Sequence, residues 1–433
     1  MLESVAVGVL MHLGAVGVFF PVLLTIELPV YLTIILGLTR DRPPPRPADP
    51  RPTLPAPTVS CIITCYNEGA CVERTVTTLM EQTYRGSIEI LAIVDGAAGN
   101  TETLVALKRL THRYARSSRR RMMVIPKWQR GGRVSSLNTG LYLSRGQIVM
   151  ALDGDTSFDN DMVANAVQRM ANPDVIALTG TLRPRNHHAG LWTRLQALEY
   201  LIGLLATRTG LSAFNVINNI SGAFGVFRRD ALLRVGGWEC GTAEDLDLTL
   251  RLKRYNGRNP RQILAFEPTA VAHTDVPETL TDLLRQRLRW DGDLYYMYVR
   301  KHRSAFSPDL LGWPNMIATV WYGLIHQVAL PFVIAGYLVW LVLLHPPAAV
   351  LTALAVVYVI YLAITMVLGG LAVALLSERR RSDLPLLAIA PVYPVYRGLM
   401  RLWSVVALLA EIILHQHKDT SMAPWWVLKR SQY

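Results

Sequence analysis

The sequence carries little charge and very little cysteine. Of its 433 residues, 18% are charged and 51% are hydrophobic, whereas soluble globular domains have about 25% charged residues. The apolar content excludes an intrinsically disordered chain and argues against an ordinary soluble enzyme. The four cysteines lack the spacing of a zinc site. They are too few for a disulfide scaffold at this length, so we expect reduced thiols in a cytosolic domain.

Acidic residues are also scarce relative to basic ones. The 44 Lys and Arg residues against 32 Asp and Glu give a formal net charge of +12. Such a surplus of positive charge is typical of proteins that bind nucleic acid or an anionic nucleotide substrate, or that face the cytoplasmic side of a membrane. The basic residues gather beside apolar stretches, at 40–51, 379–381 and 429–430, with a further cluster at 113–133. We therefore interpret most of this charge as a membrane topology signal and expect no nucleic-acid partner.

Long apolar stretches lie near both ends of the sequence. Residues 5–38 would exceed the ~30 Å hydrocarbon core as one helix, which predicts a tilted or kinked span. The residues before them lack Lys and Arg, a poor match to a secretory signal peptide. Residues 313–344 and 348–376 predict two more spans around a His-Pro-Pro turn. Residues 384–414 fit either an interfacial helix with a span or a re-entrant hairpin, giving about three to five spans in all.

These features divide the chain into five parts. They are an N-terminal transmembrane segment (1–40), a Pro- and Arg-rich linker (41–57), an α/β domain with interfacial helices (58–303), C-terminal transmembrane and interfacial helices (304–418), and a tail (419–433). The positive-inside rule places the α/β domain and the tail in the cytosol. No internal repeat is found.

The middle part alternates between strand and helix patterns. Residues 59–64, 88–94 and 147–152 are short, apolar, β-branched runs, and longer helical patterns such as 70–82 lie between them. This alternation predicts an α/β domain with a largely parallel sheet.

Polar residues follow each predicted strand, where an open α/β sheet presents its ligand contacts. Residues 64–69 close the first strand, Asp95 the second, and Asp153 and Asp155 the third. Two carboxylates at i and i+2 suit Mg²⁺ or Mn²⁺, which take oxygen ligands, although a solvated Asp-Gly-Asp turn has the same sequence. Arg133, after a Gly-Gly pair, offers a cation for phosphate.

Glu244 and Asp245 precede alternating leucines at 246–252. The alternation alone predicts a strand, while paired carboxylates beside Thr242 equally fit the start of a helix. A carboxylate at this place can act as a general base that takes a proton from a hydroxyl nucleophile.

A third motif, Gln-Arg-Leu-Arg-Trp at 286–290, follows a predicted helix start at 277–280. Gln286, Arg289 and Trp290 share one helical face. The guanidinium can hold a diphosphate and the indole can stack on a sugar ring. A basic interfacial helix would carry similar residues.

Residues 187–214 form an amphipathic segment with an apolar stripe. The stripe fits a helix that packs on the α/β domain or lies on the membrane. The alternative is that Gln196, Glu199 and Tyr200 line a path for an acceptor.

Taken in order, the motifs resemble those of membrane-embedded family 2 glycosyltransferases, which include hyaluronan, chitin, cellulose and poly-N-acetylglucosamine synthases. The motifs that carry the resemblance are 66–68, 95–96, 153–155, 244–245 and 286–290. Residues 221–229 also look like the acceptor-side loop of this family, and 277–280 favour the bacterial poly-N-acetylglucosamine branch. The resemblance implies a GT-A fold and an inverting displacement from a UDP-sugar that extends a β-linked polysaccharide and passes it outward through the membrane helices.

The resemblance also implies a role for each motif residue. It implies Tyr66, Glu68, Asp95 and Arg133 for the nucleotide, Asp153 for nucleotide or metal, Asp155 for Mg²⁺ or Mn²⁺, Glu244 for substrate, Asp245 as the general base, and Gln286, Arg289 and Trp290 for the diphosphate and the acceptor end. Three positions depart from the family pattern. Val94 replaces a usual Asp, Arg133 replaces a usual Lys, and Asp-Gly-Asp at 291–293 replaces a small or basic continuation.

We therefore expect an α/β GT-A-type domain flanked by transmembrane and interfacial helices, in a multi-pass protein of the inner membrane. The expected activity is processive transfer from UDP-N-acetylglucosamine to a growing polysaccharide. The expected partners are the donor, the polymer, the lipid bilayer, and a small accessory membrane subunit or export machinery. A UDP-glucose-dependent glucan synthase, a non-processive transferase to a lipid carrier and an inactive membrane scaffold stay open as alternatives.

Overall fold

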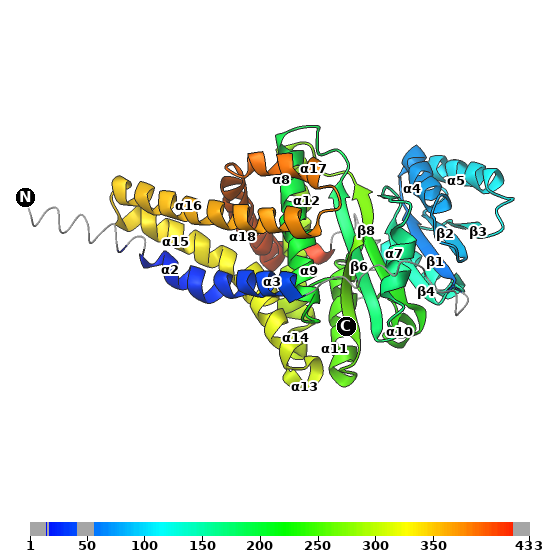
Figure 1. Ribbon diagram of the computed structural model, residues 1–433, viewed down its shortest axis with the longest axis horizontal. Coiled ribbons are helices and arrows are strands. Elements are labelled where there is room, and N and C mark those ends of the chain that lie inside the picture. The colour runs from blue at the N-terminus through cyan, green and yellow to red at the C-terminus, as the bar shows by residue number, and fades with distance from the viewer. Residues whose placement is uncertain (1–13, 15–16, 41–55, 419–433) are drawn as a thin grey trace, which may run out of the picture.

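The computed structural model describes residue 14 and residues 17–40 and 56–418. Most of the expected linker, the start of the first apolar stretch and the C-terminal tail lie outside the described residues. A sheet with its covering helices forms one end of the molecule, and long apolar helices form the other (Figure 1). A group of shorter helices lies between the two ends, and this junction holds the cavity described below.

Within the described residues, eight strands form one mixed sheet in the order β3-β2-β1-β4-β7-β6-β8-β5. They are β1 (Val59–Cys65), β2 (Ile88–Asp95), β3 (Arg120–Lys127), β4 (Ile148–Asp153), β5 (Ser157–Phe158), β6 (Val175–Pro184), β7 (Phe224–Arg228) and β8 (Ile263–Thr274). Strands β3, β2, β1 and β4 run parallel, whereas β7 runs antiparallel to both β4 and β6. The three strands predicted from the sequence are confirmed, each with a shift of about one residue at its ends, as expected for element boundaries.

The sheet is buried on both faces. Strand β1 is buried along its whole length, and successive side chains enter opposite cores: Ile62 packs in one hydrophobic cluster, Cys61 and Ile63 in the other. The covering helices are α4 (Val72–Met80), α5 (Thr101–Arg113), α6 (Gly132–Leu143), α7 (Met162–Arg169), α10 (Arg229–Arg234) and α11 (Glu244–Arg258). Burial on both faces explains the continuous apolar runs of the parallel strands.

Helix α11 is the segment whose alternating leucines alone predicted a strand, and that prediction is wrong. Leu248 and Leu252 pack in the main core, while Leu246 and Leu250 pack in a separate cluster beside the membrane-proximal helices. Because residues i and i+4 share a helical face, a helix buried on two sides produces the same alternation as a strand. The expectation of a helix start at the paired carboxylates is confirmed.

A buried helical segment connects the sheet to the apolar helices. It comprises α8 (Leu191–Glu199), π-helical turns over Tyr200–Ala206, and α9 (Thr207–Ser212). The expectation that this amphipathic segment packs on the α/β domain is confirmed, since Leu195, Leu198 and Leu201 lie in the main core. Next to it runs α12 (Leu280–Tyr295), whose first turn is capped by Thr279, which accepts from the backbone N–H of Asp282.

Three helices in the described part of the chain are long and apolar enough to cross a membrane: Phe19–Arg40, Trp313–Leu344 and Pro347–Leu376. They include α2 (Phe19–Val22), α3 (Leu28–Arg40), α14 (Trp313–Ala318), α15 (Leu330–Leu344) and α16 (Pro347–Leu371). Helix α2 and the turn between α15 and α16 lie at the end of the molecule farthest from the sheet (Figure 1).

Helix α3 meets α9 backbone to backbone. A Cβ added at Gly37 would lie 2.1 Å from the carbonyl oxygen of Gly210, and one at Gly210 would lie 2.6 Å from that of Ile34. Glycine at both positions therefore permits a close approach that any side chain would prevent. The first membrane-capable helix is in this way held against the segment that borders the sheet.

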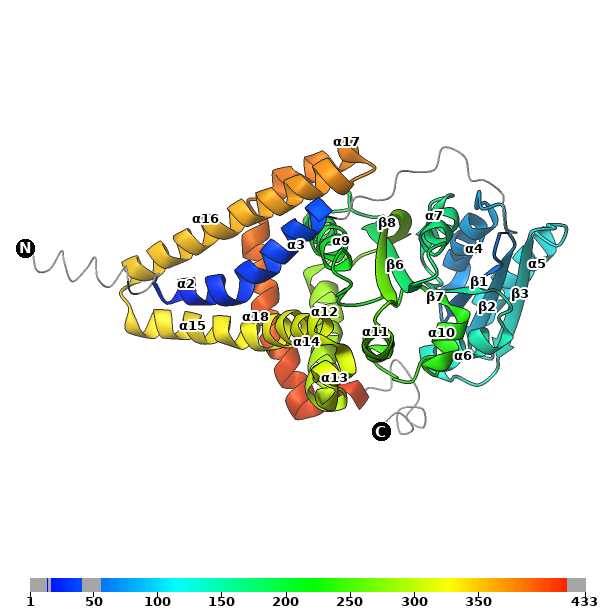
Figure 2. The ribbon, with the colours of Figure 1, turned by 60° about the horizontal axis from the view of Figure 1, so that its bottom comes forward.

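The end of the third apolar helix is tied to the sheet by ion pairs. Arg183 pairs with Asp383 (2.9 Å) in α17 (Arg380–Asp383), and Arg379 pairs with Asp159 (2.9 Å). The segment left open by the sequence, 384–414, forms a short 3₁₀ helix and then α18 (Tyr393–Leu414). Helix α18 lies across the direction of α15 and α16 (Figure 2) and packs on α12, where the Trp403 indole N–H donates to the Leu284 carbonyl (2.8 Å).

Candidate active site

Arg133, at the start of α6, joins four segments that are distant in the sequence. Its Nη1 donates to Thr64 Oγ1 (2.9 Å) at the end of β1 and to the carboxylate of Asp153 at the end of β4. Its Nε donates to Glu244 Oε1 (2.5 Å), and its Nη2 donates to the carbonyl oxygen of Gly222 (2.7 Å). Burial alone would lower the pKa of Arg133, but the charges of Asp153 and Glu244 outweigh burial and raise it. The cation expected for phosphate is thus engaged with two carboxylates of the site.

The Asp-Gly-Asp turn after β4 brings carboxylates close together. A Cβ at Gly154 would lie 3.0 Å from the carboxyl carbon of Glu68, so Glu68 rests against the turn. Burial raises the pKa of Glu68, and the charges of Asp155 and Asp153 raise it further; burial and Asp153 do the same for Asp155. Glu68 Oε2 is buried and has no hydrogen-bond partner in the described part of the chain. A bound cation would relieve this crowding of like charges.

The residues present fit a divalent ion that is held partly by substrate. Among residues 17–40 and 56–418, no group of three or more His, Cys, Asp or Glu side chains converges as a ready-made metal site. The side chain of Asp155 is accessible to solvent at the turn, although protein atoms surround much of it, whereas Asp153 is occupied by Arg133. Mg²⁺ commonly uses one or two carboxylates and completes its shell with water and substrate phosphates. Asp155 is therefore the residue best placed to hold such an ion.

Asp95 and Tyr66 lie at the ends of neighbouring strands but do not border the large cavity described below. Asp95 is 4% exposed. Its oxygens accept from Lys127 Nζ and from the backbone N–H groups of the glycine pair 131–132, each at 2.8 Å. Tyr66 is 44% exposed, and the Arg130 guanidinium lies 4.4 Å from its ring centroid. Asp95 thus anchors the turn that leads to Arg133, and Tyr66 offers an aromatic surface at the rim.

Asp245 is oriented by three hydrogen bonds at the start of α11. Its Oδ2 accepts from Asn219 Nδ2 and from the backbone N–H of Gly222, both at 3.0 Å, and its Oδ1 accepts from the backbone N–H of Leu246 (2.7 Å). A carboxylate has about four lone-pair sites, so one site is left for a ligand. Burial raises the pKa of the adjacent Glu244, which Arg133 opposes. The neighbouring carboxylates therefore have different surroundings: Glu244 is buried and paired, and Asp245 borders the cavity.

The Gln-Arg-Leu-Arg-Trp motif lies on α12, as the sequence predicted. Gln286, Arg289 and Trp290 all border the cavity. Gln286 Oε1 is buried and makes no hydrogen bond to a described residue. Trp290 is 37% exposed, and the Arg287 guanidinium lies 5.0 Å from its ring centroid. One face of the indole is thus supported by a cation, and the ring remains accessible to a ligand.

The unusual Asp-Gly-Asp continuation at 291–293 fixes α12 to its neighbours. Ser404 of α18 donates to Asp291 (2.6 Å), and Thr242, just before α11, donates to Asp293. Thr242 therefore contacts Asp293 and does not cap α11. Burial raises the pKa of Asp293 to about 7, and the negative charge of Glu244 contributes in the same direction. This departure from the family pattern connects the tryptophan-bearing helix to both sides of the site.

A single cavity of about 1240 Å³ joins the carboxylates to the apolar helices. At one end it is bordered by Asp153, Asp155 and Asp245, and at the other by Glu27, Tyr337 and Tyr361, one from each membrane-capable helix. Ligand pockets for small molecules usually measure about 300–1,000 Å³. The cavity is thus larger than a donor site alone requires.

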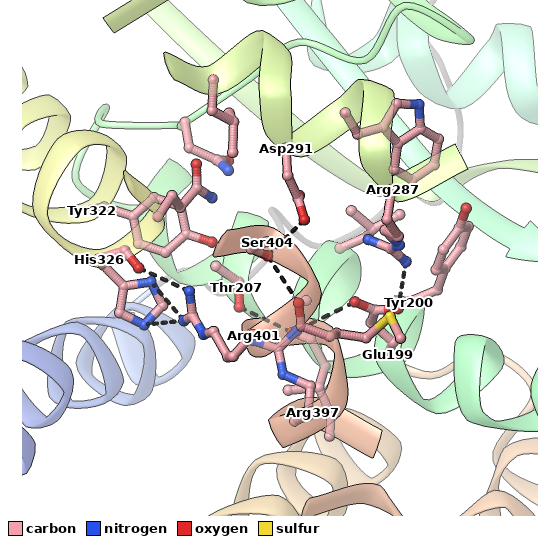
Figure 3. A pocket seen from close by; sticks show the side chains of 18 of the residues that line it. Glu199, Tyr200, Thr207, Arg287, Asp291, Tyr322, His326, Arg397, Arg401 and Ser404 are labelled. Atoms are coloured by element: carbon pink, nitrogen blue, oxygen red, sulfur yellow. Dashed lines mark hydrogen bonds and ion pairs between the residues drawn. The ribbon is translucent and has the colours of Figure 1, made fainter. Parts of the chain in front are cut away.

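A network at the cavity centres on Glu199, which the sequence offered only as an alternative lining residue. Glu199 accepts from Arg287 Nη2 (2.6 Å), Tyr396 Oη (2.7 Å) and Arg397 Nη1 (3.3 Å), so that α8, α12 and α18 meet at one carboxylate (Figure 3). Although burial alone would raise the pKa of Glu199, Arg287 and Arg397 lower it. The earlier alternative that Glu199 and Tyr200 line a path agrees with their position at the cavity, whereas Gln196 instead donates to the Pro277 carbonyl (2.8 Å).

Comparison with known protein families identifies the chain. The family model described as glycosyl transferase family group 2 matches residues 148–375, from β4 to the third apolar helix. The chain belongs to this family. It is a glycosyltransferase, and its matched region includes Asp153, Asp155, Asp245 and the α12 motif together with two of the three membrane-capable helices.

Curated relatives and a solved structure agree with this assignment. Poly-beta-1,6-N-acetyl-D-glucosamine synthase of Staphylococcus epidermidis is 29% identical over 234 residues, which are 54% of this chain and 53% of that protein. The enzyme of the same name from Staphylococcus aureus (strain COL) is 28% identical over 272 residues, 61% of this chain and 62% of that protein. The match thus spans about half to three fifths of each relative. The mannosyltransferase PcManGT from Pyrobaculum calidifontis, solved with GDP-Man and Mn²⁺, covers 95% of this chain with a TM-score of 0.57 and 21% identity, which supports the GT-A-type fold.

The glycosyltransferase fold brings most of the predicted site residues together. Arg133, Asp153, Asp155, Glu244, Asp245, Gln286, Arg289 and Trp290 border one cavity. Glu68 adjoins this group through the Asp-Gly-Asp turn, whereas Tyr66 and Asp95 lie apart, near the glycine pair before α6. The ends of β1 and β4 and the starts of α6 and α11 converge because the parallel strands share one edge.

Proposed function

We propose that the protein transfers sugar processively from a UDP-sugar to a growing β-linked polysaccharide. We propose UDP-N-acetylglucosamine as this donor. The observation that carries this proposal is the cavity, which is bordered both by Asp153, Asp155 and Asp245 and by residues of all three membrane-capable helices. A polymer extended at the carboxylates would therefore have a route toward the membrane. The names of the curated relatives support an N-acetylglucosamine polymer as the product.

The donor would lie between the strand ends and the start of α11. Tyr66, Glu68 and Asp95 would bind or position the nucleotide, and Arg133 would hold Asp153 and Glu244 in place while it adds positive charge near the phosphates. Asp155, with the diphosphate, would hold Mg²⁺ or Mn²⁺, in agreement with the Mn²⁺ in PcManGT. Such an ion would neutralise charge that develops on the leaving diphosphate.

The acceptor hydroxyl would approach Asp245 from the cavity. Asn219 and the Gly222 N–H hold one oxygen of this carboxylate and leave a lone pair for the hydroxyl proton. Removal of that proton during attack on the anomeric carbon would give inversion in a single step. Such general-base catalysis contributes about 10²–10⁴ in rate.

Helix α12 would serve both substrates. Arg289 would neutralise the leaving diphosphate, and Gln286 would supply a hydrogen-bond acceptor to a sugar hydroxyl. Trp290, supported from one side by Arg287, would stack on the acceptor sugar. Aromatic rings offer a rigid apolar face that suits a sliding polymer.

We further propose that the sheet lies in the cytosol and that the protein is a multi-pass component of the inner membrane. Arg379 at the end of the third apolar helix pairs with Asp159 of the sheet domain, so this basic end and the sheet would share one side of the bilayer. Helix α18 would then be interfacial, because it lies across α15 and α16. These orientations can be measured by labelling of single cysteines placed in the α15–α16 turn and in α17.

The function is tested with the full-length protein in lipid nanodiscs. Each nucleotide sugar, including UDP-N-acetylglucosamine, UDP-glucose and GDP-mannose, is supplied with Mg²⁺ or Mn²⁺, and nucleotide release and product size are measured. We expect UDP release from UDP-N-acetylglucosamine and a long polymer. The proposal would be overturned if none of the UDP-sugars led to UDP release. This result would have to hold both with and without a bacterial membrane extract, which could supply a partner subunit. Short lipid-linked products would favour the non-processive alternative, and turnover of UDP-glucose alone would favour a glucan synthase.

A further inference from the structure

Arg208 of α9 is a buried cation whose role the mechanism above does not explain. Its side chain is 6% exposed and borders the cavity. Its Nε and Nη1 atoms are buried and have no hydrogen-bond partner among the described residues. A buried guanidinium without partners costs several kcal/mol, so a protein seldom keeps one without a ligand for it.

Other arginines of the same cavity are paired. Arg133 binds two carboxylates, and Arg287 and Arg397 both bind Glu199. Burial lowers the pKa of Arg208, and the charge of Asp245 is the largest influence opposing burial. Arg208 is therefore near the proposed base but does not form an ion pair with it, and its donors remain available on the acceptor side.

The same cavity is also lined by an unpartnered acceptor. The Oδ1 atom of Asn218 is buried and lacks a hydrogen bond to any residue that the structure describes. Asn218 lines the cavity and precedes Asn219, which donates to Asp245. Arg208, with two buried donors, and Asn218, with one buried acceptor, thus line the same cavity as Asp245.

These unsatisfied groups limit the chemistry of their ligand. A carboxylate or phosphate would satisfy Arg208 but would offer no donor to Asn218. An acylamino group offers both, because its carbonyl oxygen can accept two N–H bonds and its own N–H can donate one. A site built to hydrogen-bond a polar substituent rejects an analogue that lacks it, since the buried partners are then left unpaired.

We propose that Arg208 and Asn218 form an acceptor subsite that binds the acylamino group of the sugar at the growing end of the polymer. Arg208 donates to the acyl carbonyl oxygen, and Asn218 accepts from the amide N–H. This inference rests on the proposed transfer to an N-acetylglucosamine polymer and adds which residues recognise the acylamino group of the acceptor. It predicts that the enzyme selects its acceptor as well as its donor.

The test uses the full-length enzyme in nanodiscs with UDP-N-acetylglucosamine and two neutral soluble acceptors of equal length. One is a β-linked N-acetylglucosamine oligosaccharide, and the other is the matching glucose oligosaccharide with hydroxyl groups in place of acylamino groups. The acceptor KM and kcat are measured for wild type, Arg208→Gln, Arg208→Lys and Asn218→Ala. UDP release without an acceptor reports the state of the donor site.

We expect the wild type to prefer the N-acetylated acceptor at least 10-fold in kcat/KM. Arg208→Gln and Asn218→Ala should lose most of this preference through a higher KM, while UDP release without acceptor stays within twofold. Arg208→Lys should retain part of it. Arg194→Gln, which changes an exposed arginine on α8, should behave as wild type. If either Arg208→Gln or Asn218→Ala does not fold, the remaining variant still tests the preference for the N-acetylated acceptor.

Three outcomes would overturn the inference: a wild type without acceptor preference, variants that lose activity equally with both acceptors, or variants that keep the wild-type preference. The second outcome would mean that Arg208 has only a structural role. Failure of the proposed function is separate, because it would appear as a wild type that releases no UDP from UDP-N-acetylglucosamine. A wild type that polymerises the sugar, with variants that keep the acceptor preference, would refute the acylamino subsite alone.

Discussion

Replacement of Arg133 by Lys tests whether one guanidinium holds the active site together. The motif pattern that this sequence resembles has Lys at this position. Here Nε and Nη2 reach Glu244 (2.5 Å) and Gly222 (2.7 Å), while Nη1 reaches Thr64 and Asp153. An ammonium group donates from a single atom and cannot span these partners.

The expected cost follows from the contacts that Lys would lose. If the ammonium stays beside Asp153, the bond to buried Glu244 and the bond to the Gly222 carbonyl are lost. A hydrogen bond to a charged group contributes about 1.5–3 kcal/mol and a neutral one about 1 kcal/mol. We therefore expect Arg133→Lys to lower the free energy of unfolding by about 3 kcal/mol. For a domain of this size, that corresponds to a fall in Tm of roughly 6–12 °C.

The cysteines provide the assay. Cys61, Cys65 and Cys240 are buried and free, and Cys71 is exposed. A thiol-reactive fluorophore therefore labels Cys71 at once and reports unfolding through the other three. Arg109→Lys, an exposed change on α5, serves as the matched control. A Tm for Arg133→Lys within one or two degrees of wild type would refute the idea that the bonds to Glu244 and Gly222 stabilise the site.

Four further predictions concern chemistry, product length, pH and helix packing. Asp245→Asn should lower polymer formation by about 10²-fold or more, while calorimetry should still detect UDP binding. Polymer synthesis near the wild-type rate would exclude Asp245 as the general base. Trp290→Ala should shorten the product on gels, and unchanged length would remove its acceptor role. Folding raises the pKa of Asp293 from 3.8 to about 7, so its contribution to stability falls as pH rises between these values. Asp293→Asn should therefore be more stable than wild type near pH 8, with an advantage that shrinks toward pH 4; an advantage independent of pH would contradict the titration. Gly210→Ala places a Cβ 2.6 Å from a carbonyl of α3 and should cost about 1–3 kcal/mol in thermal unfolding, whereas Gly336→Ala, with open space around it, should have no comparable effect.

The sequence predicted β1, β2 and β4, three of the four strands of the parallel group, and the apolar helices, because local residue patterns determine both; it did not predict β3. Continuous β-branched runs mark β1, β2 and β4, since a parallel strand is buried on both faces. The same local reasoning misjudged the leucines of α11. Their alternation arises from contacts with two different clusters, and sequence alone does not reveal that second cluster.

The candidate site was predictable in its motifs but not in its connections. The polar residues at strand ends were expected at one edge, and Asp153, Asp155 and Asp245 do border one cavity. The partners of Arg133 come from four segments spread over residues 64–244, and no local spacing encodes them. Arg208 was likewise missed, because a charged residue in an amphipathic segment resembles part of a solvated face, whereas Glu199 had been named as an alternative lining residue.

The close contact of α3 and α9 links the first apolar helix directly to the part of the chain that carries Arg208. Gly210, which touches α3, is two residues from Arg208 on the short helix α9. A shift of α3 would therefore move the Arg208 backbone, because the two helices meet through backbone atoms with no flexible side chain between them. Glu27, on the same apolar helix as α3, borders the cavity at its other end. The first apolar helix thus forms part of the wall of the cavity, and in the proposed mechanism its position would set the width of the path between Asp245 and the membrane.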